Sequence, residues 1–233
     1  MIRRFLKDTG FGFVGQAVAI VFALVSSIII ARVLGPEQRG VLAIVVLLPL
    51  TINAVVASGF SATIVHAIAS GAWEDSRAMP RVLGIWVYLT AIMLSLGLVI
   101  LKFHSQLFSG TPLPLLFYSL VLMPATLLQA CTGSILAGKR AFRYQMYSRV
   151  ASAPIGLLLT IVLVWWLDLG VLGAVTAQLV GIALSILLDL YWIPKLLSAR
   201  LVFWPDLNPG VLRGSMSFGI KSHICLLYTS PSP

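Results

Sequence analysis

Few residues of this chain have the types and spacing that catalysis requires. The histidines His66, His104 and His223 are far apart in the sequence, and no Asp or Glu stands five residues after any of them. Glu74 and Asp75 are the only adjacent acids. General acid–base chemistry needs such groups within reach of one another, and a metal site needs a set of ligands. The sequence therefore predicts a protein that is not an enzyme, with no catalytic residue, no metal site and no cofactor.

The polar residues that stand out are single side chains within or beside long apolar runs. Such a side chain is costly in a bilayer unless it contacts protein, water or a ligand, so it is a candidate for lining a polar pathway. The candidates are Gln16, Arg32, Asn53, Gln129, Arg140 and Asp189. For Asn53 and Gln129, a hydrogen bond between helices is the commoner role. For Asp189 we favour a position at the membrane interface, with proton or sodium coupling as the alternative.

Apolar runs dominate the 233 residues, of which 59% are hydrophobic and only 10% charged. A soluble domain has about 25% charged residues, and a helix needs about 20 apolar residues to cross a membrane. Runs without Asp, Glu, Lys or Arg cover residues 9–31, 40–73, 82–101, 103–138, 150–167 and 169–188. The sequence therefore predicts an all-α polytopic membrane helix bundle with six transmembrane helices and the start of a seventh near Gly214.

The turns between the runs set the expected helix limits. Gly35-Pro36 ends the first helix, because proline has no N–H for the helical ladder and disfavours helical geometry in the residue before it. The charged residues that follow need water, so residues 31–40 are expected to form a turn. Helices are expected at about residues 10–34, 40–60, 82–101, 115–136, 150–167 and 169–193, with an interfacial turn at 61–73 and a basic turn at 138–149.

Small residues recur along two of these helices. The first helix has a small, weakly polar stripe of Gly12, Gln16, Ala19, Ala23 and Ser26 or Ser27, and the sixth has Gly173, Ala177, Gly181 and Ser185. Helices in lipid approach closely where small residues meet, so close packing is the preferred interpretation. The wall of a central cavity is the alternative for the first helix. The basic turn at 138–149 has two interpretations as well, a charge that keeps the loop in the cytoplasm or a site that gathers phosphate-bearing lipids.

The net charge of +9 reflects membrane topology rather than a nucleic-acid surface. With the N-terminus inside the cell, twelve cations fall on the inner side of the predicted helices and three on the outer side. The inner ones are Arg3, Arg4, Lys7, Arg77, Arg81, Lys139, Arg140, Arg143, Arg149, Lys195, Arg200 and Arg213; the outer ones are Arg32, Arg39 and Lys102. By the positive-inside rule, we expect a cytoplasmic N-terminus and no nucleic-acid partner.

Three segments are expected along the chain. Residues 1–194 form a six-helix lobe, residues 195–213 a cytoplasmic amphipathic connector, and residues 214–233 the start of a seventh helix. That last part is too short to span a membrane, and its tail at 225–233 looks like translated sequencing-adaptor sequence rather than native protein. We therefore expect that a longer protein is truncated here.

Several motifs, taken in their order along the chain, resemble those of a known family. They are the basic amino end, the hairpin turn Ala31–Val41 (ARVLGPEQRGV), the helix end Ala57–Ala62 (ASGFSA), the basic turn Leu136–Tyr144 (LAGKRAFRY) and the helix start Gly214–Gly219 (GSMSFG). Through them, residues 1–222 resemble the oligosaccharide flippase (polysaccharide biosynthesis, O-antigen exporter) family of the multidrug/oligosaccharidyl-lipid/polysaccharide exporter superfamily.

The resemblance implies two six-helix lobes around a cavity that opens alternately to either side, with this chain as the N-terminal lobe. The implied activity moves undecaprenyl-pyrophosphate-linked oligosaccharide from the inner to the outer leaflet of the bacterial inner membrane for cell-surface polysaccharide such as the O-antigen of lipopolysaccharide. A proton or sodium gradient, membrane lipid and a polysaccharide polymerase are implied as driving force and partners. Under this resemblance Arg140 would meet the pyrophosphate at the cytoplasmic entrance and Arg32 would line the exit.

Three other functions stay open on the sequence alone. A cation-coupled multidrug exporter of the same superfamily commonly carries an acidic residue within the first helix, where this chain has only Gln16. A flippase for a lipid-linked peptidoglycan precursor would resemble the favoured function closely. An integral-membrane transferase is disfavoured, because clustered acids and His–acid pairs are missing.

Overall fold

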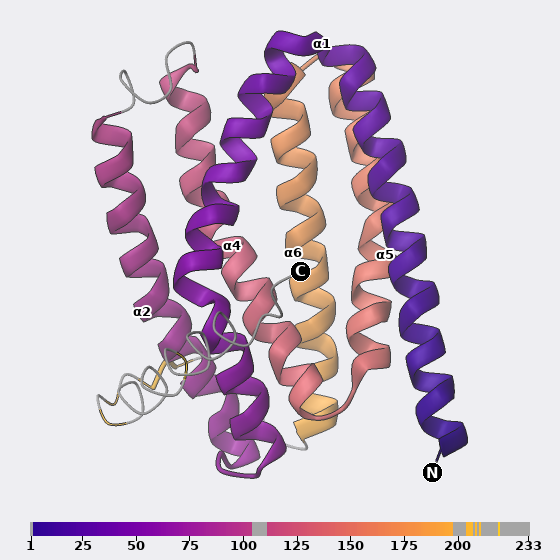
Figure 1. The fold of residues 1–233 in the computed structure, drawn as a ribbon, viewed down its shortest axis with the longest axis vertical. Helices are drawn as coiled ribbons and strands as arrows, with labels where there is room; N and C mark the ends of the chain where they lie inside the picture. Colours follow the sequence, from indigo (N-terminus) through magenta and orange to yellow (C-terminus); the bar gives the residue numbers. More distant parts are fainter. Residues whose placement is uncertain are drawn as a thin grey trace, which may run out of the picture.

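The computed structural model of this chain describes residues 2–103, 111–197, 204–206, 208, 210 and 219, with side chains from residue 15 onward except 57 and 58. Within these residues the elements are α1 (Ile2–Ala69), α2 (Asp75–Lys102), α4 (Leu113–Gly138), α5 (Phe142–Thr160), the π-helical segment η1 (Ile161–Trp166) and α6 (Gly170–Leu197), with no strand. Figure 1 shows the helices running from one end of a single bundle to the other. The predicted all-α bundle is confirmed.

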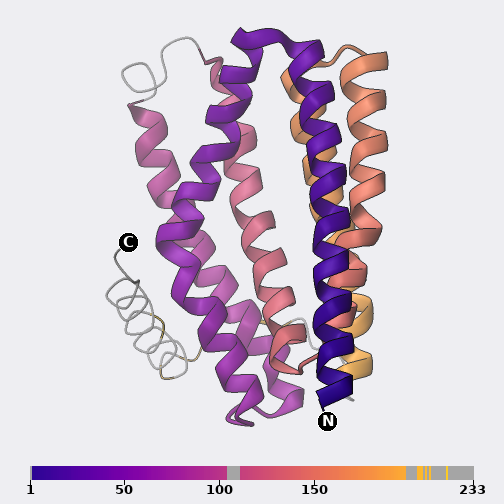
Figure 2. The same cartoon turned by 45° about the vertical axis from the view of Figure 1, so that its right-hand side comes forward.

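Helix α1 is bent back on itself at Gly35, and its two arms run along the bundle in opposite directions (Figures 1 and 2). Gly35 has φ 69° and ψ 179°, a conformation open essentially to glycine alone. Pro36 then begins the second arm, since proline is tolerated in a first helical turn. The sequence predicts a charged turn over residues 31–40. That prediction is wrong in extent, because residues 31–34 and 36–40 are helical and the glycine alone makes the bend.

The two arms of α1, together with α2, α4, α5 and α6, make six passes along the described bundle. Each of these helices is long and apolar enough to cross a membrane, and the 42 residues of α1 from Gly15 to Val56 supply two passes. Large apolar side chains are exposed, among them Ile20, Leu24, Val55, Leu98, Val121, Leu158 and Leu187. Such a surface suits lipid rather than water, so the chain is a multi-pass membrane protein. Of the predicted connector at 195–213 only residues 195–197, 204–206, 208 and 210 are described, and the predicted seventh helix near Gly214 lies outside the described residues except for Gly219.

Three predicted helix limits lie furthest from the observed ones, and one of them is the start of α2, which is at Asp75 rather than at residue 82. The second arm of α1 continues to Ala69, so residues 61–69 are helical rather than part of an interfacial turn. Helix α5 begins at Phe142 rather than at residue 150, so most of the basic segment forms its first two turns. All three errors come from treating polar or charged residues as helix ends. A charged side chain can stay within a membrane helix when its head reaches an interface or a polar cavity.

Helix α4 is central to the packing. Its Met123 and Ile135 are almost fully buried against α2 and the second arm of α1, while Leu122 belongs to a second apolar cluster with α6 and η1. A Cβ added to Gly138 would lie 2.8 Å from the Cβ of Ile68, so α1 and α4 approach as closely as a small residue permits. This central helix therefore holds in place the elements between which the candidate site lies.

Replacing Gly35 with Ala should destabilise the protein by about 1–3 kcal/mol, because a residue with a Cβ is strained in this backbone conformation. No atom lies within 4 Å of the position of that Cβ, so the loss would come from the backbone alone. The matched control is Gly40→Ala, which also has open space around the Cβ but is helical, where alanine is favourable. Thermal unfolding midpoints in detergent micelles measure both variants, and equal midpoints would contradict the requirement for glycine at the bend.

Candidate functional site

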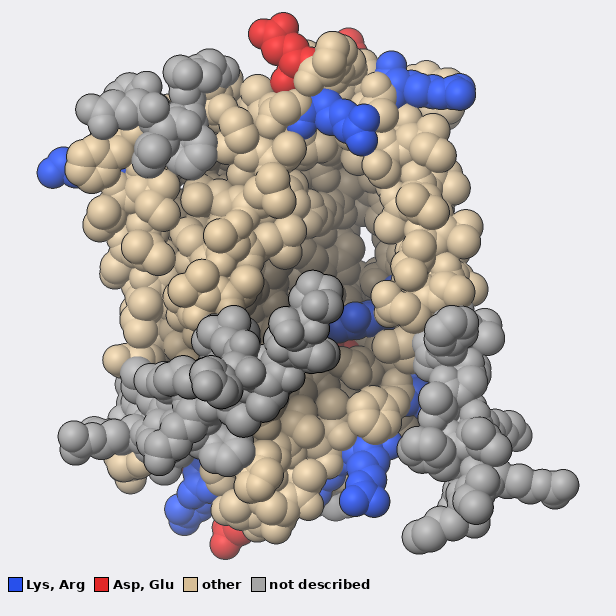
Figure 3. All heavy atoms as spheres, in the orientation of Figure 1, with Lys and Arg blue, Asp and Glu red and all other residues tan. Residues whose placement is uncertain are grey.

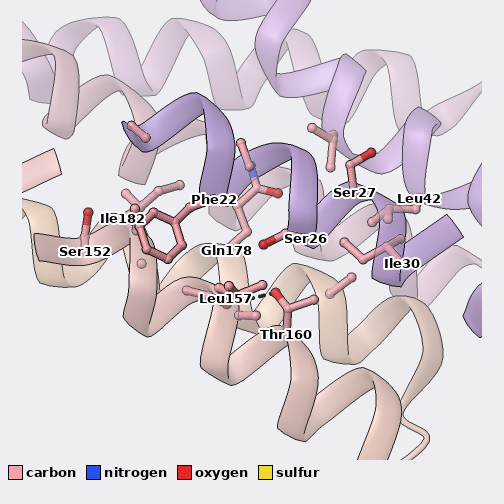
Figure 4. Close-up of a pocket in the computed structure, with 18 of the residues that line it drawn as sticks. Phe22, Ser26, Ser27, Ile30, Leu42, Ser152, Leu157, Thr160, Gln178 and Ile182 are labelled. Carbon is pink, nitrogen blue, oxygen red and sulfur yellow. Dashed lines mark hydrogen bonds between the residues drawn. The ribbon is translucent and has the colours of Figure 1, made fainter. Parts of the chain in front are cut away.

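A cavity of about 780 Å³ lies between the two arms of α1 and helices α4, α5 and α6. Much of its wall is apolar, and polar side chains project from several of the helices (Figure 4). The polar and charged lining residues are Ser26, Ser27, Arg39, Gln129, Arg149, Ser152, Thr160 and Gln178. Ligand pockets in proteins commonly enclose about 300–1,000 Å³. The cavity is therefore large enough for a small molecule or for the headgroup of a lipid.

Small side chains on three helices create this space. The first arm of α1 contributes Ala19 and Ala23, α5 contributes Gly156, and α6 contributes Ala177 and Gly181. The pairs on α1 and α6 are four residues apart, so each pair lies on one face of its helix. The part of the first helix's stripe from Ala19 to Ser27 thus lines a central cavity, which is the alternative that the sequence left open beside close packing.

The cavity is cationic. Arg39 and Arg149 line it, and no Asp or Glu stands among its described lining residues. Arg39 follows the bend of α1, whereas Arg149 lies seven residues into α5 from the opposite end of the bundle, a distance of about 10 Å along the helix. Figure 3 shows a basic side chain on the wall of the hollow, away from both ends of the bundle. An anionic group inside would therefore meet guanidinium groups, which bind phosphate oxygens in bidentate geometry.

Behind this wall, Asp189 of α6 is only 2% exposed. Thr132 of α4 donates a hydrogen bond to its Oδ2 over 2.9 Å, its Oδ1 has no hydrogen-bond partner among the described residues, and the positive charge of Arg149 on α5 attracts the carboxylate. Neighbouring helices cover this side chain, so it does not reach out to water from the helix end, and its position at the membrane interface stays a prediction. A carboxylate beside an arginine stabilises the cationic charge within a membrane span, so Asp189 supports Arg149 from behind the cavity wall.

Four other sequence candidates lie elsewhere. Gln16 and Arg32 are exposed on the first arm of α1, and Arg140 is exposed in the turn between α4 and α5. Asn53 Nδ2 donates a hydrogen bond to Thr126 Oγ1 over 3.2 Å and so joins α1 to α4. None of these four residues lines the cavity, and their place in a substrate pathway stays a prediction.

Gln129 is the sequence candidate that lines the cavity, beside Arg149 and Gln178, which the sequence does not single out. The sequence prediction places Arg149 in the basic turn, because the predicted fifth helix begins at residue 150. A helix drawn through the basic segment would have placed Arg149 on the same face as Ser152 and Gly156, three and seven residues further on. Gln178 carries no such signal, because a lone glutamine on an apolar helix is equally compatible with packing.

The family model for polysaccharide biosynthesis protein matches residues 5–231 of the chain. The chain belongs to this polysaccharide biosynthesis family. The family that the sequence motifs resemble is thereby confirmed. No curated protein matches the chain.

Solved structures show which fold this family member has. MATE in complex with Br-NRF aligns with a TM-score of 0.67 at 20% identity, over 97% of this chain and 54% of that one. An outward-facing multidrug resistance MATE family transporter of the MOP superfamily aligns with a TM-score of 0.67 at 23% identity, over 93% and 51%. A MOP superfamily transporter from Pyrococcus furiosus Vc1 aligns with a TM-score of 0.63 at 19% identity, over 94% and 51%. The chain thus has the fold of the N-terminal lobe of these proteins and spans about half of their length.

Replacing Thr132 with Val should destabilise the protein by about 1–3 kcal/mol, because the buried carboxylate of Asp189 loses a hydrogen-bond donor. Thr176→Val is the matched control, since its hydroxyl donates to carbonyl oxygens of its own helix, those of Leu172 and Gly173. Thermal unfolding in detergent micelles compares the two. If Thr132→Val proved as stable as Thr176→Val, the hydrogen bond to Asp189 would contribute nothing to the fold.

Proposed function

We propose that the protein is the N-terminal lobe of a flippase that moves lipid-linked oligosaccharide from the inner to the outer leaflet for cell-surface polysaccharide synthesis. The proposed substrate is an undecaprenyl-pyrophosphate-linked oligosaccharide. The observation that carries the proposal is the central cavity, whose described lining residues include two arginines and no acid. Membership of the polysaccharide biosynthesis family supports the same substrate class.

A lipid-linked oligosaccharide needs a polar cavity to cross the membrane. A saccharide and a pyrophosphate cannot cross hydrocarbon unaided, because each unpaired polar group costs several kcal/mol there. In the cavity, the side chains of Gln129, Ser152 and Gln178 offer hydrogen bonds to sugar hydroxyls, and Arg149 offers charge-assisted bonds to pyrophosphate. The polyprenyl tail would stay in the surrounding lipid, where it needs no protein contact.

A multidrug exporter is the second candidate, and the fold shared with MATE structures favours it. The charge of the cavity counts against it, because an organic cation would meet Arg39 and Arg149 without an acid among the described lining residues. A flippase for a lipid-linked peptidoglycan precursor would handle the same pyrophosphate chemistry with a different headgroup. The cationic cavity therefore suits the anionic substrate of either flippase better than it suits the cationic substrate of a drug exporter.

The proposed orientation places the N-terminus in the cytoplasm of a bacterial inner membrane. Cations gather at the N-terminal end of the bundle, at Arg77, Arg81, Lys139, Arg140, Arg143 and Lys195, and fewer lie toward the Gly35 end, at Arg32, Arg39 and Lys102. This bias follows the positive-inside rule. A proton or sodium gradient would drive the cycle, and a polysaccharide polymerase would receive the product on the outer side.

In lipid nanodiscs, the purified chain should bind an undecaprenyl-pyrophosphate-linked oligosaccharide. Arg149→Gln should weaken this binding roughly tenfold or more, because a charge-assisted hydrogen bond to phosphate is lost. Arg77→Gln is the matched control, since it removes an exposed cation on α2 away from the cavity and should leave the affinity unchanged. Microscale thermophoresis measures the dissociation constants.

The same measurement with ethidium, an organic cation, separates the two classes of transporter. The cationic cavity predicts no ethidium binding at concentrations that saturate the lipid-linked sugar. Binding of ethidium without binding of the lipid would overturn the proposal in favour of drug export. Equal losses in Arg149→Gln and Arg77→Gln would show that net charge, rather than the cavity, attracts the substrate.

A further inference from the structure

A second basic pocket lies at the N-terminal end of the bundle, apart from the central cavity. It encloses about 320 Å³ and is lined by Arg140, Ala141, Phe142, Arg143, Tyr144 and Tyr147. None of these residues lines the central cavity. The volume is near the lower limit of protein ligand pockets, about 300 Å³, which suits one phosphate-sized headgroup rather than a saccharide chain.

The turn between α4 and α5 presents Arg140 at this pocket. Arg140 has φ 56°, a left-handed conformation that costs free energy for a residue with a Cβ and that glycine adopts readily. The neighbouring Lys139 pairs with Asp75, whereas no described Asp or Glu pairs with Arg140 within 4 Å. The turn thus holds an exposed arginine where glycine would be less strained, which favours a role for the guanidinium itself.

Aromatic side chains of the kind found at the depth of lipid headgroups lie in and near the pocket. The rings of Tyr144 and Trp192 lie 4.6 Å apart between α5 and α6, and Lys195 Nζ lies 3.8 Å from the centre of the Tyr191 ring. Phe142 and Tyr191 are exposed. Tyrosine and tryptophan are enriched at membrane–water interfaces, and basic residues there attract anionic lipid. The pocket therefore combines cations with the aromatic residues typical of the interface.

We propose that this pocket binds the phosphate headgroup of an anionic phospholipid in the leaflet at the N-terminal end of the bundle. Arg140 and Arg143 supply planar guanidinium groups that match phosphate oxygens in bidentate geometry. No Asp or Glu stands among the described lining residues to repel the anion. The site is separate from the central cavity and does not depend on the substrate proposed for that cavity.

Native mass spectrometry of the full chain, released from micelles that contain equimolar phosphatidylglycerol and phosphatidylcholine, tests the site. The chain should retain phosphatidylglycerol in preference to phosphatidylcholine. Arg140→Gly should reduce this preference roughly fivefold, the equivalent of the attraction of one cation near the membrane surface. Adding Arg143→Gln should reduce it by a further factor of similar size.

Two comparisons separate a binding site from a structural role and from net charge. Arg140→Gly relieves the left-handed strain, so its thermal unfolding midpoint should not fall although lipid retention does. Arg77→Gln removes a cation from the same end of the bundle outside the pocket and should leave the preference intact. The proposal is overturned if phosphatidylglycerol is not preferred, if the pocket variants keep the preference, or if Arg77→Gln loses as much. Displacement of the lipid by an equal concentration of glycerol phosphate would overturn it too, since the pocket would then bind a free anion.

Discussion

Hydrocarbon offers no hydrogen-bond partner, and this constraint organises the whole bundle. Every backbone N–H and C=O must be paired within its own segment, so the described chain crosses as helices and reverses α1 at Gly35, where glycine permits the conformation. The same constraint applies to side chains. Arg149 reaches a polar cavity, and Asp189 accepts a hydrogen bond from Thr132. These two charged residues are therefore found where protein or a cavity replaces water.

The sequence predicts the bundle well, because charge-free runs of membrane-spanning length leave few alternatives. It also predicts the break at Gly35-Pro36, since both residue types act on the local backbone. It misplaces the start of α5, because an arginine is taken as the end of a span when the helix actually continues through it. It cannot decide which polar residues line the cavity, since the face that each helix turns inward depends on packing among helices distant in the sequence.

Small residues show why that decision needs the structure. On α6, Ala177 and Gly181 line the cavity, whereas a Cβ added to Gly173 would lie 2.8 Å from the carbonyl oxygen of Leu163 in the preceding segment. One stripe with a regular spacing thus serves both close packing and open space. The residue type permits either outcome, and the distance to the neighbouring helix decides between them. Together with the arginines, this open stretch gives the family member an interior that suits anions.

The positive charge of the central cavity is most directly tested by cysteine accessibility. In a chain that carries Cys131→Ala and Cys225→Ser, the single changes Ser26→Cys and Ser152→Cys place a thiol on the cavity wall. A cationic cavity predicts that an anionic methanethiosulfonate reagent reacts several times faster than a cationic one at both positions. Leu158→Cys, on an exposed part of α5, should react with neither reagent in lipid. Faster reaction with the cationic reagent, or no reaction at either cavity position, would contradict the cationic cavity.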